Sequence, residues 1–526
     1  MHRGKVVWLV LTTAFLIYGL SVKSQEDDKF KDKGLVVNID LDKADPLKAN
    51  ALVYPIDQLI KPILEKDTML LRFMDELEPG VFRFPPAHVA NFFNPNTSLL
   101  ELSEESLRSI KDSSISNELL RYQKLYKKEN ILDEVLDFVR SRNASLLYVA
   151  NLYTGDTTDL KLVLKKVKNS GLSLSGIEMG YRLYQKPYRD VFKKADSYLS
   201  KAESFHAIIN QQLEDVPVAL CLSPLKKFQR DPSDDAENSK WNSKLSEASF
   251  HDAWSISLSY DVGKCYKKDD VDRIYDCVFD GFLDYVNKDV PEYFVKLQEN
   301  YRKELWVNSF GLSHQAEMLQ NSFLEANVVF DLAKAMIDQN LRDTFMITRY
   351  GINKSYHSSA YRSLFSRKLL IEKEVDNRAK IYKRAAYFPL YFLKGISNKK
   401  SEKLIGSGAS NIPNLIKTGK FSFTGFYNPD KITAHFYMVN KTDIPLRLDA
   451  IYFKGRLRYR GSTGKVETFK YTAGEWYSSY GVNSWVKESE LYDNSELYMV
   501  YDGDKVQPRD FIIPPKSIYY IRIRVK

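Results

Sequence analysis

The stretch SLLYVANLYTGDTTDLKLVLKKVKNSGLSLSGIEMG (residues 145–180) holds one complete strand–helix–strand unit. Its first eight residues form the apolar run of a buried strand, and LSLSGIEMG forms a second such run. Between them, apolar residues recur at helical spacing: Leu160, Val163, Leu164 and Val167. Gly171 follows as the expected left-handed cap. This unit predicts two parallel strands joined by a helix.

The same alternation recurs on both sides of this unit. VPVALCLSP (216–224), AWSISLSY (253–260) and KELWVNSF (303–310) are further predicted strands, and residues 314–337 have the apolar periodicity of a long helix. Because strands and helices alternate over residues 49–400, the sequence predicts a (β/α)8 TIM barrel, an α/β fold of the usual size for this length.

The C-terminal part of the chain has a different pattern. A Gly/Ser-rich stretch over residues 401–411 predicts a linker, and residues 412–526 alternate with a period of two between turn residues. This pattern predicts an all-β sandwich domain. The segment 25–48 contains one isolated strand, GLVVNIDL (34–41), which we expect to pair into the sandwich and so join the two ends of the chain.

The N-terminus carries targeting information. Arg3 and Lys5 precede an apolar run from Val6 to Leu20, so residues 1–24 read as a secretory signal peptide. The run is shorter than the roughly 20 residues of a spanning helix. A retained signal anchor is the alternative. Cleavage would leave no transmembrane segment and place the protein outside the cell, at its surface or in the periplasm.

Cysteines and charge limit the chemistry. Cys265 and Cys277 bracket a charged segment, and an oxidising compartment would permit a disulfide between them, whereas Cys221 lies in an apolar run. No Cys/His spacing indicates a metal, and we expect no cofactor. The formal charge is +9, and +6 without residues 1–24. This mild excess is compatible with an acidic glycan or a protein partner and does not indicate nucleic acid.

Four stretches at predicted strand ends occur in this order: FRFPPAHVANFF (82–93), LYVANLYTG (147–155), IEMGYRLY (177–184) and ELWVNSFGL (304–312). As an ordered set they resemble strand ends of clan A glycoside hydrolases of the α-L-arabinofuranosidase, heparanase-like and β-xylosidase-like type. The resemblance implies a retaining mechanism, in which an acid/base carboxylate and a nucleophilic carboxylate lie about 5 to 5.5 Å apart.

Both carboxylates are missing at the matching positions. The resemblance puts Arg182 at the acid/base glutamate and Ser309 at the nucleophile. An arginine keeps its proton near neutral pH, and a serine without a positioned base is a weak nucleophile. We therefore expect no catalytic residues and a degenerate member of the family.

The remaining candidates are ligand-binding residues: Arg83, His88, Asn91, Glu178, Tyr181, Tyr184, Tyr260 and Trp306. Pro86 and Ala87 replace the paired glycines of the family pattern, which stiffens the floor of the cleft. We expect Glu178 to stabilise the fold. Arg182 has two interpretations, as a plug of the cleft or as a contact for an anionic sugar.

These expectations lead to a functional hypothesis. The chain is predicted to be a secreted pseudoenzyme that binds a glycan or scaffolds a cell-surface or periplasmic assembly. An active retaining glycosidase with relocated carboxylates is the competing hypothesis, and a structural subunit with a filled cleft is the third.

Overall fold

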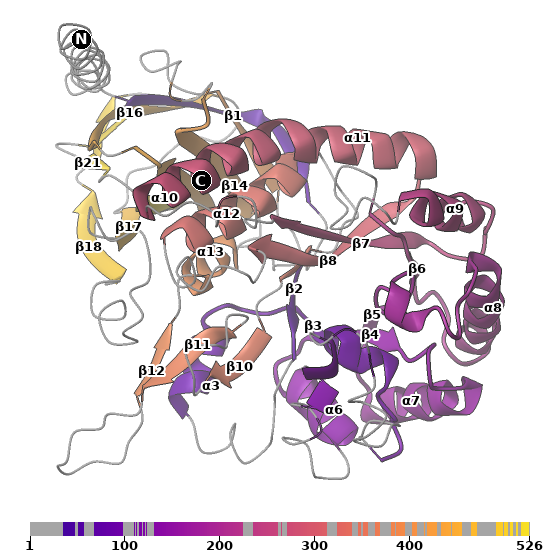
Figure 1. Ribbon diagram of the computed structural model, residues 1–526. Helices are drawn as coiled ribbons and strands as arrows, with labels where there is room; N and C mark the ends of the chain where they lie inside the picture. The colour runs from indigo at the N-terminus through magenta and orange to yellow at the C-terminus, as the bar shows by residue number, and fades with distance from the viewer. Residues whose placement is uncertain are drawn as a thin grey trace, which may run out of the picture. The chain divides into compact units, whose positions relative to one another are not determined.

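The structure is a computed structural model, and it divides into two compact units (Figure 1). One comprises Pro46–Ser401 with Tyr477–Lys487, and the other Met1–Asp45, Glu402–Trp476 and Glu488–Lys526. Within these units the described residues are 35–47, 51–56, 68–97, 131–224, 235–260, 271–312 and 323–338, with shorter pieces between 110 and 123, at 265, from 346 to 394, and from 402 to 524. The predicted signal peptide at 1–24 lies outside the described residues.

The larger unit is built on a closed barrel of parallel strands. The strands are β2 (Leu52–Pro55), β3 (Val81–Phe84), β4 (Ser145–Ala150), β5 (Leu174–Met179), β6 (Val218–Cys221), β7 (Ala253–Tyr260), β8 (Glu304–Leu312) and β9 (Met346–Thr348). They pair in chain order, and β9 pairs back with β2. The TIM-like barrel predicted from the strand–helix alternation is confirmed.

Helices surround the barrel (Figure 1). They are α3 (Thr68–Asp75), α6 (Ile131–Ser141), α7 (Thr157–Ser170), α8 (Ala195–Gln212), α9 (Asp235–Leu245), α10 (Val271–Asp284), α11 (Val290–Tyr301), α12 (Phe323–Asp338) and α13 (Tyr387–Phe392), with a π-helical turn, η6 (Tyr285–Asp289), joining α10 to α11. Helix α7 starts in a capping box of Asp156 with Asp159. It ends at Gly171, whose φ of 69° is the predicted left-handed cap.

An apolar layer fills one level of the barrel interior. It is formed by six fully buried side chains from different strands: Val53, Val81, Leu147, Ala219, Ala253 and Trp306. Gly176 of β5 makes room for the largest of them, because a Cβ at this position would lie 2.3 Å from Trp306 Cη2. Trp306 is therefore a core residue that packs the barrel.

The smaller unit contains an eleven-stranded sheet. Its strands are β1 (Leu35–Pro46), β13 (Glu402–Ser407), β14 (Phe421–Asn428), β15 (Thr433–Asn440), β16 (Leu446–Lys454), β17 (Gly464–Lys470), β18 (Leu491–Leu497), β19 (Met499–Asp502), β20 (Lys505–Pro508), β21 (Ile512–Ile513) and β22 (Ser517–Arg524). The N-terminal strand β1 pairs in parallel with β16, whereas β14, β15, β22 and β17 pair antiparallel in that order. The division of this sheet into a sandwich stays a prediction.

Two features differ from the sequence-based expectation. Residues 402–407, predicted as linker from their Gly/Ser content, form β13 and pair antiparallel with β14. Leu404 and the β-branched Ile405 suit a strand, and the glycine near its end does not prevent the pairing of Glu402–Leu404. The larger unit also contains a three-stranded sheet of β10 (Gly351–Ser355), β11 (Ser363–Lys368) and β12 (Lys380–Lys383), where only barrel elements were predicted.

Cys265 and Cys277 form a disulfide that fastens the segment after β7 to α10. Cys221 is a free, buried thiol. In the part of the chain that the structure describes, none of the helices combines the length and apolar character needed to cross a bilayer.

Candidate functional site

A polar layer lies one step above the apolar layer, toward the carboxyl ends of the strands. Its four members are each two residues beyond Val81, Gly176, Ala253 or Trp306: Arg83, Glu178, Ser255 and Asn308. Because residues two apart on a strand share a face, these side chains also point into the barrel. All four are at least nine-tenths buried.

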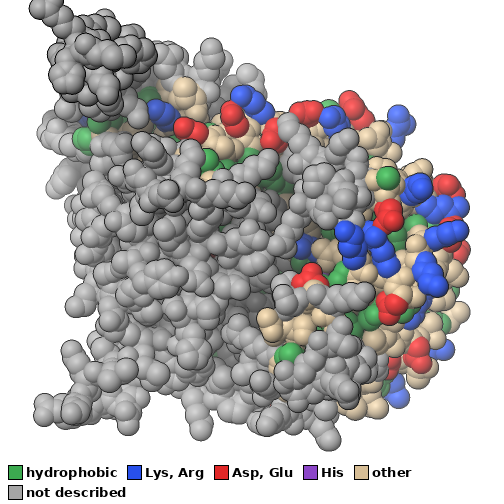
Figure 2. Space-filling model, viewed as in Figure 1, with side chains coloured by type: hydrophobic (Ala, Val, Ile, Leu, Met, Phe, Trp, Pro, Cys, Tyr) green, Lys and Arg blue, Asp and Glu red, His purple; other side chains and the backbone are tan. Residues whose placement is uncertain are grey.

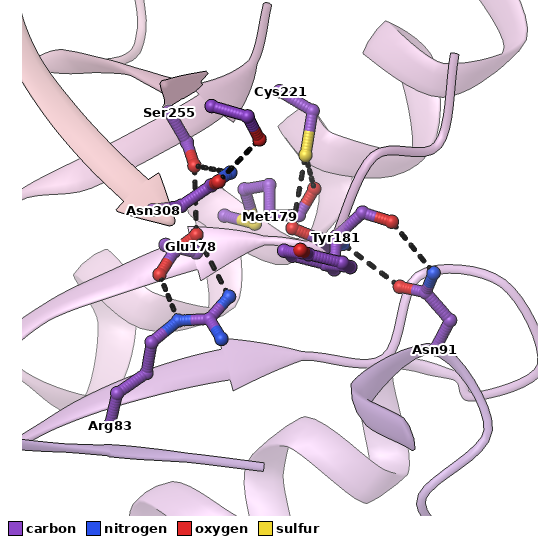
Figure 3. Close-up of polar contacts among 10 residues, drawn as sticks. Arg83, Asn91, Glu178, Met179, Tyr181, Cys221, Ser255 and Asn308 are labelled. Atoms are coloured by element: carbon purple, nitrogen blue, oxygen red, sulfur yellow. Dashed lines mark hydrogen bonds and ion pairs between the residues drawn. The ribbon is translucent and has the colours of Figure 1, made fainter. Parts of the chain in front are cut away.

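Arg83 and Glu178 form a buried ion pair between β3 and β5 (Figure 3). Arg83 Nε lies 2.6 Å from Glu178 Oε1, and Arg83 Nη2 lies 3.2 Å from Oε2, so the contact is bidentate. The side chains are 2% and 0% exposed. Burial acts to lower the pKa of Arg83, but the charge and hydrogen bonds of Glu178 raise that pKa above its usual value. The guanidinium of Arg83 is therefore held charged inside the barrel, against the carboxyl group of Glu178.

A chain of hydrogen bonds, here called the relay, continues from this pair to Arg182. Ser255 Oγ donates to Glu178 Oε2 at 2.8 Å, and Asn308 Nδ2 donates to Ser255 Oγ at 2.8 Å. Ser257 Oγ donates to Asn308 Oδ1 at 2.7 Å, and Arg182 Nε donates to Ser257 Oγ at 2.9 Å. Every donor points toward Glu178, so each hydroxyl in the relay has its one proton committed.

A β-bulge places Asn308 inside the relay. The register of β7 against β8 shifts after Ile256, so that Ser257 lies opposite Ser309 and Asn308 is the extra residue of β8. Bulges redirect side chains, and this one brings Asn308 between Ser255 and Ser257. Ser309, at the position that the resemblance gives to the nucleophile, is buried at 6% exposure.

Arg182 and Tyr181 follow β5 at the mouth of the barrel. Gly180 and Arg182 both have left-handed backbone conformations, with φ of 80° and 51°. This turn lays the Tyr181 ring between two guanidinium groups, at 5.2 Å from Arg83 Cζ and 5.1 Å from Arg182 Cζ. The negative ring face is a favourable neighbour for both cations. Arg182 is half-buried.

Asn91 and His88 hold this turn in place. They lie on the short helix η1 (Ala87–Asn91) after β3. Asn91 Nδ2 donates to Tyr181 O at 2.8 Å, and Asn91 Oδ1 accepts from Tyr181 N at 2.9 Å (Figure 3). The His88 ring packs edge-on against Tyr181 at 5.0 Å. Both the nitrogen and the oxygen of the Asn91 side-chain amide are therefore hydrogen-bonded to the backbone of Tyr181.

Three other candidates occupy different surroundings. Tyr260 lies on the outer face of β7, where its hydroxyl donates to Val278 O of α10 at 2.9 Å. It is an odd number of residues from the inward-pointing Ser255 and Ser257, so it points away from the barrel interior. Trp306 belongs to the apolar layer. In the structure both side chains make packing contacts, and a role for either in ligand binding stays a prediction. Tyr184 is half-buried. Burial raises its pKa, and the nearby charge of Arg182 acts in the opposite direction without reversing the shift.

Carboxylates are scarce in the barrel wall. Across the sequences of the eight strands β2–β9, Glu178 and Glu304 are the only acidic residues. Glu304 is at the amino-terminal end of β8 and accepts from Trp306 Nε1 at 3.2 Å. These strands therefore contain no acidic pair at the mouth that could protonate and attack the same sugar. Among the described residues there is also no group of three His, Cys, Asp or Glu side chains placed to hold a metal.

Sequence reasoning missed the middle of the relay. Ser255, Ser257 and Asn308 lie on strands that read as plain apolar runs. The signal is the period-two spacing of serines in SISLS (255–259), which is unusual in a barrel strand buried on both sides. Predicting the contacts between β7 and β8 also required the bulge, for which the sequence has no marker.

Solved structures of similar fold are glycoside hydrolases. A family 51 arabinofuranosidase from Xanthomonas axonopodis pv. citri aligns with a TM-score of 0.63 and 10% identity, over 93% of this chain and 100% of that one. The α-L-arabinofuranosidase from Thermotoga maritima aligns with a TM-score of 0.61 and 12% identity, over 93% and 99%. A family 44 xyloglucanase from Paenibacillus polymyxa aligns with a TM-score of 0.56 and 10% identity, over 94% and 100%.

These likenesses establish the fold, which is the one that the resemblance to clan A glycoside hydrolases predicts. No protein-family model matches the chain, and no curated protein matches it.

Proposed function

We propose that this protein is a secreted, glycoside-hydrolase-like pseudoenzyme whose barrel mouth binds a glycan without cleaving it. The observation that carries the proposal is the relay. It ends at Arg182, the position that the resemblance gives to the acid/base glutamate, and it begins at Glu178, a carboxylate already engaged by Arg83 and Ser255. A guanidinium cannot transfer a proton to the leaving oxygen near neutral pH.

Glu178 is a poor replacement catalyst. Its carboxyl oxygens already accept three hydrogen bonds, two from Arg83 nitrogens and one from Ser255 Oγ. An acid/base catalyst must contact the leaving oxygen, and a nucleophile must reach the anomeric carbon. The carboxylate is fully buried, one layer below the turn that carries Arg182. This arrangement favours the pseudoenzyme over a glycosidase with relocated carboxylates.

The test is a hydrolysis and binding screen on purified residues 25–526. Aryl glycosides, arabinan and xyloglucan are suitable substrates, because the solved structures of similar fold are named for arabinofuranosidase and xyloglucanase activity. We expect no hydrolysis above a heat-denatured control and measurable binding to at least one glycan. Hydrolysis that is lost in Glu178→Gln and kept in Glu304→Gln would instead establish the relocated-carboxylate enzyme. Co-purification of a protein complex with no glycan binding would favour a scaffold.

A further inference from the structure

The loop that follows β5 is strongly basic. Residues 180–194, here called the basic loop, contain five basic residues and one acidic residue, a formal net charge of +4. The whole chain of 526 residues has a formal charge of only +9. On the face in Figure 2, by contrast, the described surface near α8 and α9 mixes Lys and Arg with Asp and Glu side chains. Much of the net positive charge of the chain is therefore carried by the basic loop.

Aromatic anchors give the basic loop a fixed shape. Tyr188, at the end of the short helix η2 (Lys186–Tyr188), is fully buried, and its hydroxyl lies 2.6 Å from His88 Nδ1. Phe192 is 2% exposed and packs edge-on against Tyr198 of α8 at 5.8 Å. Because both anchors are buried, the exposed residues of the basic loop lie before, between and after them.

The cations on this frame face outward. Lys186, Lys193 and Lys194 are exposed, while Arg189 pairs with Glu237 of α9. The single acidic residue, Asp190, accepts hydrogen bonds from the Tyr153 hydroxyl at 2.9 and 2.8 Å. The carboxylate of Asp190 keeps its negative charge, which the formal net charge of +4 for the basic loop already includes.

The position of Lys194 is unfavourable for the fold. Lys194 is the N-cap residue of α8 and provides no side-chain cap, and Lys193 precedes it. The amino-terminal end of a helix carries a partial positive charge, so cations there are destabilising, whereas Ser, Thr, Asp or Asn would cap it. Asp196 in the first turn of α8 offsets part of this unfavourable charge, and an external anion would offset more of it.

The basic loop also lies where ligands of this barrel type bind. It connects the carboxyl end of β5 to α8, and loops at that end of the strands form the binding face of TIM barrels. Its first residues include Arg182, which the relay fixes at the mouth. We infer that the basic loop is the contact surface for an acidic polysaccharide, whose carboxylate or sulfate groups meet Lys186, Lys193 and Lys194. This inference rests on the proposed function and names its ligand class.

Polygalacturonate is the probe, with neutral dextran and inorganic polyphosphate as comparisons, and binding is measured by titration calorimetry at low and moderate salt. The double variant K193S/K194S is expected to bind polygalacturonate about three- to tenfold more weakly than the wild type, because each exposed charge contact contributes modestly. Binding of the wild type should weaken as salt rises. The matched control K161S/K165S removes two exposed lysines from α7 and should bind like the wild type.

Three outcomes would overturn the inference: no binding of polygalacturonate, equal losses in the two double variants, or polyphosphate bound as tightly as polygalacturonate. A protein that binds only neutral glycans without cleaving them would also overturn it and leave the proposed function standing. Hydrolysis of the neutral substrates tests the proposed function separately, so the two failures are distinguishable. Thermal unfolding of each variant confirms that the folded protein was titrated.

Discussion

Arg182 at the barrel mouth is connected to Glu178 in the barrel interior by hydrogen bonds through Ser257, Asn308 and Ser255. All the donors point the same way, from the guanidinium toward the carboxylate. The cation at the mouth and the ion pair below it therefore belong to one polar system, and substitutions along it have different, predictable effects.

The first prediction concerns the buried ion pair. Glu178→Leu and Arg83→Met should each reduce the free energy of unfolding by about 3–5 kcal/mol, because each leaves an unpaired buried charge. The double variant should lose less than the sum, since no charge then remains in the apolar interior. Urea unfolding of the four proteins in a double-mutant cycle measures the coupling. Additive losses would mean that the two side chains act independently.

The second prediction concerns the polarity of the relay. Asn308→Asp replaces the donor to Ser255 by an acceptor, so Ser255 can no longer donate to both neighbouring carboxylates. Burial and the charge of Glu178 should raise the pKa of the new carboxyl above its unfolded value of about 3.9. The variant should therefore lose about 1–3 kcal/mol at pH 7 and regain stability as the pH falls toward 4.

The measurement is urea unfolding at several pH values, with Asn287→Asp as the control. Asn287 is exposed on the helical turn between α10 and α11. The same chemical change there should therefore give a protein whose stability depends on pH as that of the wild type does. A loss of stability in Asn308→Asp that does not change with pH would contradict the argument.

The third prediction is acid destabilisation through His251. This side chain is 2% exposed, and neither ring nitrogen has a hydrogen-bond partner among the described residues. Burial, followed by the charges of Lys303 and His206, lowers its pKa to about 3. The fold therefore favours the neutral ring, and its contribution to stability is complete above the unfolded pKa of about 6.5 and lost as pH falls from there toward 3.

His251→Phe should remove this part of the pH dependence, which amounts to as much as about 1.4 kcal/mol per pH unit below 6.5. Phenylalanine preserves the edge-on packing against Trp254, where the ring centroids are 4.1 Å apart. Unfolding of wild type and variant at pH 7.5, 5.5 and 4.5 makes the comparison. If the two stability curves run parallel, His251 does not titrate in this range.

The fourth prediction separates binding from stability at Lys194. Lys194→Ser supplies the missing N-cap of α8 and removes a cation from its amino-terminal end, so the free energy of unfolding should rise by about 1 kcal/mol. The same variant should bind polygalacturonate more weakly. Chemical denaturation and calorimetry on one sample of each protein give both values. A Lys194→Ser variant that is less stable than the wild type would contradict the claim that Lys194 destabilises helix α8.

Much of the barrel could be predicted from local patterns. The strands around 145–150, 174–179 and 253–260 and the end of α7 at Gly171 follow from apolar runs, helical spacing and glycine conformation. The β13 strand could not be recognised, because its glycine and serine are typical of linkers and only pairing with β14 makes it a strand. Likewise, Tyr260 matched a family position, but the strand's alternation turned it outward.

The amino-acid sequence by itself determined the alternation of strands and helices and the absence of glutamates at positions 182 and 309, because both are properties of residue order. The tertiary structure alone decided what replaced the missing carboxylates. Ser255, Ser257 and Asn308 contact one another only because β7 and β8 pair in parallel with a bulge after Ile256. Glu178 and Arg83, 95 residues apart, meet because barrel closure turns both side chains into one buried interior.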